Sequence, residues 1–248
     1  MKIDKLYQYQ IPQIIITSWK QNQGERLLPL QSQALTKYGL LDNKSLIISS
    51  PTSSGKTFCG EIAAVSKLSR RQKVIYLVPL KAMAEEKYLD FQNKYASLGI
   101  KILISTQDHF ENDLDLTTGN FDLALVIYEK FNQLLIKNLD ILKQVALIII
   151  DELQMLFDET RGPVLELALT KVANYSAVGG KDKPQILGLS AVLQETGIAT
   201  ALGDWLGCQL LVEKTRPVEL HQGVLFQGLF HFKKFNTGEE GFEDFLDL

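Results

Sequence analysis

The segment SLIISSPTSSGKT, residues 45–57, decides the fold of this chain. Its first six residues form an apolar run without polar alternation, as expected for a strand that is buried on both faces. Small and polar residues follow and end in Gly55-Lys56-Thr57, where a helical pattern begins. A strand, a loop of small residues and a helix, in this order, are the context of a phosphate-binding loop.

The composition of this loop explains why it would bind phosphate. Small side chains let consecutive backbone N–H groups curve around phosphate oxygens, and the start of the following helix adds positive potential. Lys56 would place its charge beside the β- and γ-phosphates of ATP, and the Thr57 hydroxyl would bind magnesium. The generic pattern has glycine where Ser50 stands, so a chance turn is the alternative. The predicted phosphate contacts are Pro51, Thr52, Ser53, Ser54, Gly55, Lys56 and Thr57.

The alternation of apolar runs and helical segments continues through the chain. Helical periodicity is present in four segments, at residues 57–68, 82–95, 129–138 and 164–173. Further strand-like runs lie at residues 73–78, 101–105, 123–127, 145–151 and 185–190. This order predicts an α/β fold in which a mostly parallel sheet carries helices on both faces. Ligands of such sheets bind at the carboxyl ends of the strands, which is where the loop is expected to lie.

A second strand end carries two acids. The apolar run Val145–Ile150 is followed directly by Asp151 and Glu152. In phosphate-loop ATPases such acids hold the metal ion and act on the attacking water, so we expect Asp151 to bind magnesium and Glu152 to polarise the water. Acids at strand ends are common, but together with the phosphate loop they give a strong signal for an ATPase.

The overall composition excludes several classes of protein. The chain has 248 residues, of which 46% are hydrophobic and 22% charged, so a disordered chain is excluded. The longest aliphatic run, Val145–Ile150, is far shorter than the roughly 20 residues of a membrane helix, and we expect no membrane partner. Two cysteines indicate a reducing, intracellular compartment, whether cytoplasm, nucleoid or nucleus. A net charge of −3 gives no general attraction for nucleic acid, although a local basic track is compatible with it.

With these motifs in place, the sequence resembles the first RecA-like domain of superfamily 2 helicases of the DExH group. It is most similar to the Ski-type branch, which includes DNA-repair helicases related to the helicase half of polymerase theta. The resemblance covers about residues 27–228, and the family's form of the phosphate loop often begins with a small residue such as Ser50. Besides the two motifs above, it rests on Leu28–Gln31, Val78–Ala82, Ser105–Asp108, Tyr128–Lys130 and Ser190–Val192.

The resemblance implies roles for further residues. Gln31 would read the adenine edge of ATP, and Gln154 would belong to the catalytic set with Asp151 and Glu152. Coupling of hydrolysis to movement would fall to Ser190, Ala191 and Val192. Nucleic-acid contacts would be made by Pro79, Lys81, Thr106, Glu129 and Lys130.

Three positions depart from the family pattern. Gln154 replaces the histidine of DExH, and Val192 replaces the threonine of the Ser-Ala-Thr motif. In this family both positions couple hydrolysis to movement. Ile127-Tyr128 replaces two small hydroxyl residues, which normally contact phosphate. These departures leave nucleotide binding intact and bear on the efficiency of coupling.

The resemblance implies an ATP- and magnesium-dependent motor domain that acts on single-stranded or forked nucleic acid, DNA rather than RNA. We expect residues 1–228 to form the RecA-like domain and residues 229–248 to be a tail leading toward a second RecA-like domain of the parent chain. The phenylalanines of the tail (Phe230, Phe232 and Phe235) would dock on that domain or stack on bases. The alternatives are a helicase-like scaffold with weakened catalysis and a phosphate-loop ATPase that does not act on nucleic acid.

Overall fold

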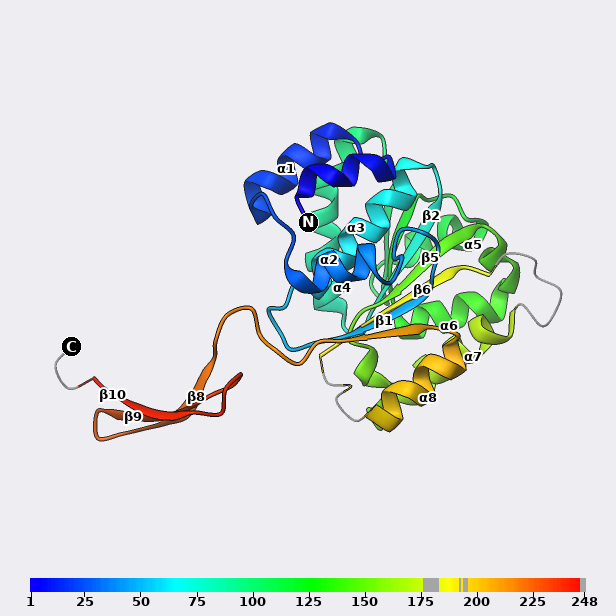
Figure 1. Ribbon diagram of the computed structural model, residues 1–248. Coiled ribbons are helices and arrows are strands. Elements are labelled where there is room, and N and C mark those ends of the chain that lie inside the picture. Colours follow the sequence, from blue (N-terminus) through cyan, green and yellow to red (C-terminus); the bar gives the residue numbers. More distant parts are fainter. Residues whose placement is uncertain (176–182, 192, 194–195, 246–248) are drawn as a thin grey trace.

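The fold is built on a seven-stranded parallel sheet (Figure 1). The computed structural model describes residues 1–175, 183–191, 193 and 196–245. The strands lie side by side in the order β3-β4-β2-β5-β6-β1-β7. Their bounds are β1 Leu46–Ser49, β2 Lys73–Val78, β3 Ile102–Ser105, β4 Leu123–Ile127, β5 Val145–Ile150, β6 Gln185–Ser190 and β7 Gln209–Val212. The six strands expected from apolar runs are all present, and the predicted α/β class is confirmed.

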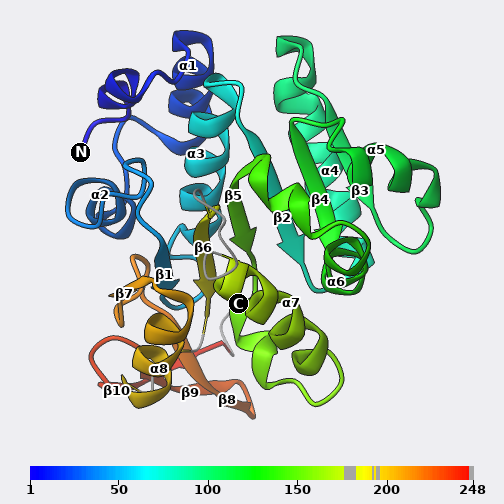
Figure 2. The ribbon, with the colours of Figure 1, turned by 90° about the vertical axis from the view of Figure 1, so that its right-hand side faces the viewer.

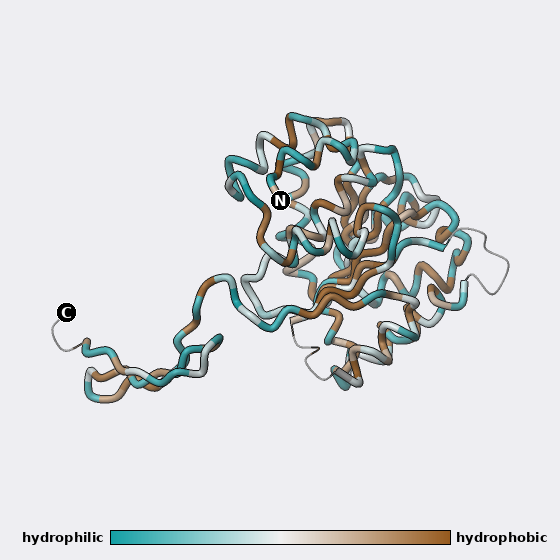
Figure 3. Tube along the Cα trace, viewed as in Figure 1, coloured by the Kyte–Doolittle hydropathy of each residue, from teal (hydrophilic) through white to brown (hydrophobic). Residues whose placement is uncertain are grey.

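Each inner strand is apolar on both sides because the sheet separates two cores. Along β1, for example, Leu46 and Ile48 enter one core while Ile47 enters the other. This follows from the twofold side-chain period of a strand. The hydropathy trace shows the strands as the apolar centre of the domain (Figure 3). Continuous Ile, Val and Leu runs are therefore the consequence of helical cover on both faces.

Helices cover the two faces of the sheet, as Figure 2 shows from the side. One core receives side chains from α1 (Gln13–Gln23), α2 (Pro29–Thr36), α3 (Lys56–Ser69) and α4 (Lys81–Tyr95). The other receives them from α5 (Asp113–Thr118), α6 (Tyr128–Lys137), α7 (Gly162–Asn174) and α8 (Thr196–Leu206). Short 3₁₀ turns join these elements at Ile3–Tyr9, Ala96–Leu98, Phe110–Asn112, Leu139–Lys143 and Leu153–Phe157. The four helices expected from periodicity are present as α3, α4, α6 and α7.

The strand order places three motifs side by side. Strand β6 lies between β5 and β1, with Ser190 beside Ser49 and Gly188 beside Ile150. The loop after β1, the acids after β5 and the end of β6 therefore meet at one edge of the sheet. Since all strands are parallel, this is the carboxyl edge, where ligands of such sheets bind.

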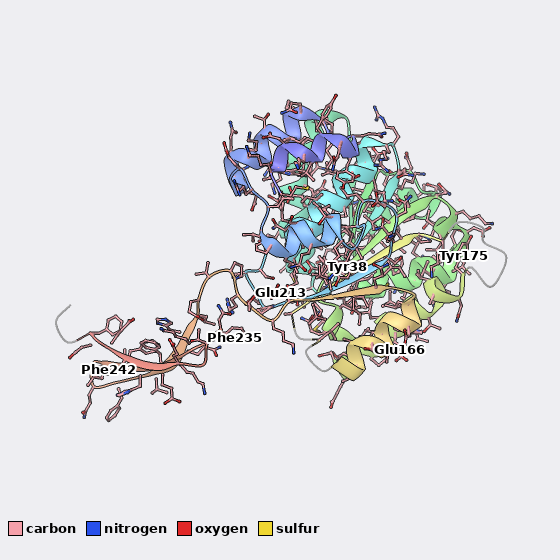
Figure 4. The ribbon with its side chains drawn as sticks, viewed as in Figure 1. Tyr38, Glu166, Tyr175, Glu213, Phe235 and Phe242 are labelled. Carbon is pink, nitrogen blue, oxygen red and sulfur yellow. The ribbon has the colours of Figure 1, made fainter. Side chains whose placement is uncertain are left out.

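A small separate sheet follows the main one. Strands β8 (His221–Phe226), β9 (Leu229–Lys234) and β10 (Glu240–Asp244) pair antiparallel in the order β10-β9-β8. In Figure 1 this three-stranded arm extends away from the domain, and Figure 4 places Phe242 on the arm and Glu213 where the chain leaves the domain. The predicted boundary at residue 228 falls in the turn between β8 and β9, so the arm begins earlier than expected. The reason is that β8 pairs with β9 and not with the main sheet.

The helices of the described ranges include none that is both long and apolar enough to cross a membrane.

Candidate functional site

The loop between β1 and α3 has the backbone shape of a phosphate cradle. Ser53 and Gly55 adopt left-handed φ angles of 65° and 87°, which fold the chain back on itself before α3 begins at Lys56. The loop is held from within by the Ser54 hydroxyl, which lies 2.6 Å from the Ser50 hydroxyl and donates to the Pro51 carbonyl at 2.7 Å. Successive αR and αL residues of this kind form anion-binding concavities.

The donors of the loop fit a phosphate chain. In the described part of the molecule, the backbone N–H groups of Gly55, Lys56 and Thr57 have no protein acceptor. The Lys56 ammonium group donates to the carbonyls of Ser50 and Pro51, across the mouth of the loop. Burial lowers the pKa of Lys56, an effect that Glu152 and Asp151 oppose. A partly buried cation beside unpaired N–H groups is a site that anionic oxygens would stabilise.

Gln31 packs directly against this loop. Its side-chain oxygen accepts from the Leu28 N–H at 2.8 Å, and its nitrogen donates to the Gly55 carbonyl at 3.2 Å. A Cβ atom at position 55 would press on the Gln31 side-chain nitrogen, and the φ of 87° is strained for any residue with a side chain, so glycine is favoured there. The amide of Gln31 is therefore engaged by protein at both ends, and in this arrangement it positions the loop. Its predicted contact with adenine stays a prediction.

A small pocket lies beside the phosphate loop. Leu28, Pro29 and Leu30 line it on one side and Glu213, Thr215 and Pro217 on the other, with Ser54 of the loop at its floor. Arg216 in the second segment is close enough to Lys56 to lower its pKa electrostatically. The chain that leads into the β8–β10 arm thus lines the pocket beside the phosphate loop.

Asp151 is held by two side chains that the sequence analysis did not assign to it. Tyr76 donates to Asp151 Oδ2 at 3.1 Å, and the Lys87 ammonium lies 3.2 Å from the same oxygen. Burial and the charge of Asp151 raise the pKa of Tyr76, so its hydroxyl stays a donor. Lys87 also lies over the Tyr76 ring, 4.8 Å from its centroid. The carboxylate is thus oriented through one oxygen, and its other oxygen accepts from the Glu152 N–H at 3.1 Å.

Glu152 adopts an unusual backbone conformation. Its φ of 52° and ψ of 47° are left-handed, a conformation that a non-glycine residue adopts at a cost of roughly 1–3 kcal/mol. The Tyr128 hydroxyl donates to the Asp151 carbonyl and lies 3.4 Å from the Glu152 carbonyl. A buried tyrosine at the start of α6 therefore holds the turn in which Glu152 lies. This is the position where the family has a small hydroxyl residue.

Gln154 joins the acids to the end of β6. Its nitrogen donates to the Glu152 carboxylate, while its oxygen accepts from the Ser190 hydroxyl at 2.8 Å and the Ala191 N–H at 3.2 Å. The predicted members of this group therefore meet, as the strand order requires. Val192 lies outside the described residues. Glutamine can form this bridge because its side chain both donates and accepts hydrogen bonds.

The predicted nucleic-acid contacts lie along the same edge, but each basic one is paired with an acid. Lys81, at the start of α4, lies 2.8 Å from Asp108. Lys130, on the first turn of α6, lies 2.8 Å from Asp113, and its side chain is only 12% exposed. Glu129 is partly exposed next to it. These pairs would have to open or reorient before either lysine binds a phosphate.

Two predicted contact residues are buried. Thr106 is inaccessible, and its hydroxyl accepts from the Asp108 N–H at 3.3 Å. Pro79 is buried as well, and its carbonyl accepts from the guanidinium of Arg161, which precedes α7. Thr106 and Pro79 therefore lie beneath the surface in this structure, and their direct contact with nucleic acid stays a prediction.

Comparison with known proteins identifies the family. The sequence pattern described as DEAD/DEAH box helicase matches residues 28–199. The chain belongs to the DEAD/DEAH box helicase family. The matched range contains every side chain of the carboxyl edge described above except Glu213, Thr215, Arg216 and Pro217.

Individual relatives are archaeal helicases. The ATP-dependent DNA helicase Hel308 of Pyrococcus horikoshii is 35% identical over 246 residues, which cover 97% of this chain and 32% of that protein. Proteins of the same name from Methanocaldococcus jannaschii and Thermococcus kodakarensis are each 39% identical, over 80% and 92% of this chain. The chain spans only 16% and 19% of those two helicases. It thus corresponds to a DEAD/DEAH box domain within longer relatives.

Proposed function

We propose that this chain is the ATP-binding motor domain of a DNA helicase, in which ATP hydrolysis drives translocation or unwinding. The observation that supports the proposal best is the bridge from Glu152 through Gln154 to Ser190. It connects the candidate hydrolytic acid with the end of β6, between the phosphate loop and the acids. A plain nucleotide-binding domain would have no need of that connection.

Binding of ATP would use the loop and the pocket beside it. The unpaired N–H groups of Gly55, Lys56 and Thr57 would donate to the phosphate oxygens, and Lys56 would exchange its carbonyl partners for the β- and γ-phosphates. The adenine would enter the pocket between Leu28–Leu30 and Glu213–Pro217. Gln31 would keep the loop in place from behind.

Hydrolysis would then depend on the two acids. Magnesium, held by Thr57 and Asp151, would neutralise charge on the phosphates. Glu152 would orient the attacking water and take up its proton at the carboxylate. Tyr76 and Lys87 fix the Asp151 carboxylate, and Tyr128 fixes the backbone between the acids. The side chains are therefore positioned before ATP arrives, which lowers the reorganisation needed during the reaction.

Coupling would pass through Gln154. A change in the Glu152 carboxylate as the phosphate leaves would alter its bond to Gln154, and hence the bonds from Gln154 to Ser190 and Ala191. Because β6 lies between β5 and β1, movement of its end would displace both the acids after β5 and the phosphate loop after β1. Gln154 cannot become cationic, so this coupling would not require a proton on residue 154.

We propose single-stranded or forked DNA as the substrate, because the relatives are named as DNA helicases. Lys81 and Lys130 would exchange Asp108 and Asp113 for backbone phosphates. Such contacts carry little sequence information, so we expect no sequence preference. A motor that acts on cellular DNA would work inside the cell, which agrees with the two free cysteines.

A second RecA-like domain of the parent chain would complete the motor. The arm exposes large apolar side chains, among them Val224 at 70%, Phe226 at 67% and Phe242 at 69%. It is tied to the nucleotide region, since Asn236 exchanges hydrogen bonds with the backbone of Arg216 at 2.7 and 3.0 Å. A domain docked on the arm would therefore be linked mechanically to the wall of the base pocket. Phe230 and Phe232 already stack within the arm, which favours docking over base stacking.

The experiment compares this chain with a longer polypeptide of the same parent that continues through a second RecA-like domain. We expect the 248-residue chain to bind ATP weakly, hydrolyse it barely and unwind nothing, because no second domain supplies the opposite face of the site. The longer protein should show ATPase activity stimulated by single-stranded DNA and should unwind forked duplexes, and Glu152→Gln should abolish both. Robust unwinding by the 248-residue chain, or full turnover by the Glu152→Gln protein, would contradict the proposal.

A further inference from the structure

A second polar hollow lies at the opposite edge of the sheet from the phosphate loop. Its walls include the first residues of three strands, Lys73 of β2, Val145 of β5 and Gln185 of β6. The end of α3 and the turn that follows it, residues 67–72, form another wall. The hollow has a volume of about 490 Å³. Nothing in the proposed mechanism uses this amino edge.

The lining of this hollow, which we call the amino-edge hollow, is basic throughout. Its charged residues are all cations, and four amide side chains stand between them. No aspartate or glutamate is among the described residues that line it, although the whole chain carries 29 acids against 26 bases. The cations are Lys67, Arg71, Lys73, Lys143 and Lys183, and the amides are Asn43, Gln72, Gln144 and Gln185.

These cations are poorly compensated by the protein itself. Lys67 is only 3% exposed, and its ammonium donates to the neutral amide of Asn43. Burial and, to a lesser extent, the nearby charge of Arg70 lower the pKa of Lys67 to about 8, so its charged form is less stable here than in water. Lys73 likewise donates to a neutral amide, that of Gln144, at 2.8 Å.

The remaining cations of the hollow also lack strong ion pairs within the described residues. Within the described residues, neither Arg71 nor Lys183 forms an ion pair, and Lys143 pairs only with Asp140. Both members of that pair are more than half exposed, and exposed pairs are weak. Several positive charges thus converge on one concavity without matching negative charge.

The backbone of Arg71 is a further unusual feature of the lining of this hollow. Arg71 adopts a left-handed φ of 59°, a conformation that glycine adopts at lower cost, yet an arginine stands there and lines the hollow. A ligand with several anionic oxygens would compensate the cations that line the hollow.

We propose that the amino-edge hollow binds a multivalent phosphate group. Phosphate carries the charge density that clustered lysines and an arginine fork recognise. The concave shape favours a compact group over the side of a duplex. The same phosphate chemistry is available from a free anion such as pyrophosphate and from the backbone of a single strand, and the experiment separates these two sources.

The test is calorimetric titration at pH 7 and low salt with pyrophosphate as the probe. All proteins carry Lys56→Ala, which weakens any contribution of the phosphate loop to the same extent in every variant. We expect this background to bind pyrophosphate, and the added pair Arg71→Gln and Lys73→Gln to weaken binding by about tenfold or more, since two charge-assisted contacts are lost. The matched control removes two exposed lysines that do not line the hollow, Lys137→Gln and Lys233→Gln, and should bind as the background does.

A second titration uses a single-stranded oligonucleotide as competitor. If the oligonucleotide displaces pyrophosphate and loses affinity with Arg71→Gln and Lys73→Gln, the hollow takes a nucleic-acid phosphate. If it does not compete, the hollow takes a free anion. The proposal is overturned if neither probe binds in the Lys56→Ala background, or if the hollow pair and the control pair bind alike. Because Lys56 is absent throughout, failure here would leave the proposed ATPase function standing.

Discussion

Tyr128→Phe tests the support beneath the two acids in isolation. It removes one oxygen atom, the hydroxyl that donates to the Asp151 carbonyl, and leaves the buried ring in place. No other donor to that carbonyl is found in the described part of the chain. An unpaired buried carbonyl costs about 2 kcal/mol, and in a domain of this size each kcal/mol lowers Tm by roughly 2–4 °C. We therefore expect Tm to fall by about 4–8 °C.

The assay is thermal unfolding followed by circular dichroism, with Tyr7→Phe as the matched control. Tyr7 is 69% exposed and its hydroxyl has no partner in the described residues, so the control should keep the wild-type Tm. Tyr128 makes no hydrogen bond to the phosphate loop, and binding of a non-hydrolysable ATP analogue should be unchanged in Tyr128→Phe. A Tm within about 1 °C of wild type would refute the idea that Tyr128 holds the Glu152 turn.

Three further predictions concern other contacts. In ATPase assays of the longer protein with and without DNA, Gln154→Ala should lose most of the stimulation by DNA but still bind the ATP analogue, because the hydrogen bonds to Glu152 and Ser190 are both removed. Gln154→His should keep the stimulation by DNA, since a neutral imidazole both accepts and donates hydrogen bonds. Gln31→Ala should weaken ATP and GTP analogues by the same factor in titrations, because its bonds position the loop, and selective loss of ATP would show instead that Gln31 reads the base. For Lys67 the folded-state pKa of about 8 lies below its ordinary value of 10.5, so the unfolded chain holds more protons between these pH values and stability should rise as pH rises through that window. Denaturant titrations at pH 8 and pH 10 should show a smaller rise for Lys67→Met than for wild type, and an equal rise would contradict the assignment.

The central strands could be predicted because burial on both faces leaves a strong signal. The run Lys73–Val78 coincides with β2, and the run expected at residues 185–190 coincides with β6. Strand β7 was not predicted, since Gln209–Val212 is short and lies at the sheet edge, where three of its four side chains keep contact with solvent. Edge position weakens the apolar pattern from which the other strands were recognised.

The strands of the arm were not predicted, because the sequence pattern there is ambiguous. Apolar Phe230 and Phe232 alternate with polar His231 and Lys233, which is a period of two. That alternation does form β9, but a strand pattern alone does not show which partners will pair. The partners, β8 and β10, follow from local hairpin turns and not from the main sheet.

The site was predicted to the extent that it depends on motifs along the chain. The meeting of Gln154 with Ser190 follows from the position of β6 between β5 and β1, which the sequence does not state. Lys87 was not singled out from the sequence, because its contact with Asp151 depends on how α4 packs over the sheet. Distances of this kind arise from tertiary packing, so residue spacing could not reveal them.

The burial of Thr106 shows a second limit of prediction from sequence motifs. Its position in a family-like segment suggested a contact at the surface, yet the side chain lies at the end of β3 beneath the loop that carries Asp108. A motif identifies a place in the fold. It does not distinguish the residue that touches a ligand from the residue that supports it.

The claim that β1 and α3 enclose an ATP phosphate site is tested most directly at Lys56. Calorimetric titration with a non-hydrolysable ATP analogue and magnesium would compare the chain with its Lys56→Ala variant, both carrying Arg71→Gln and Lys73→Gln to weaken the amino-edge hollow. Loss of a charge-assisted contact to phosphate should weaken binding by about tenfold or more. Lys233→Ala, an exposed lysine on the arm, is the control and should bind as the background protein does. Equal affinity for the analogue with and without the Lys56 side chain would contradict the account.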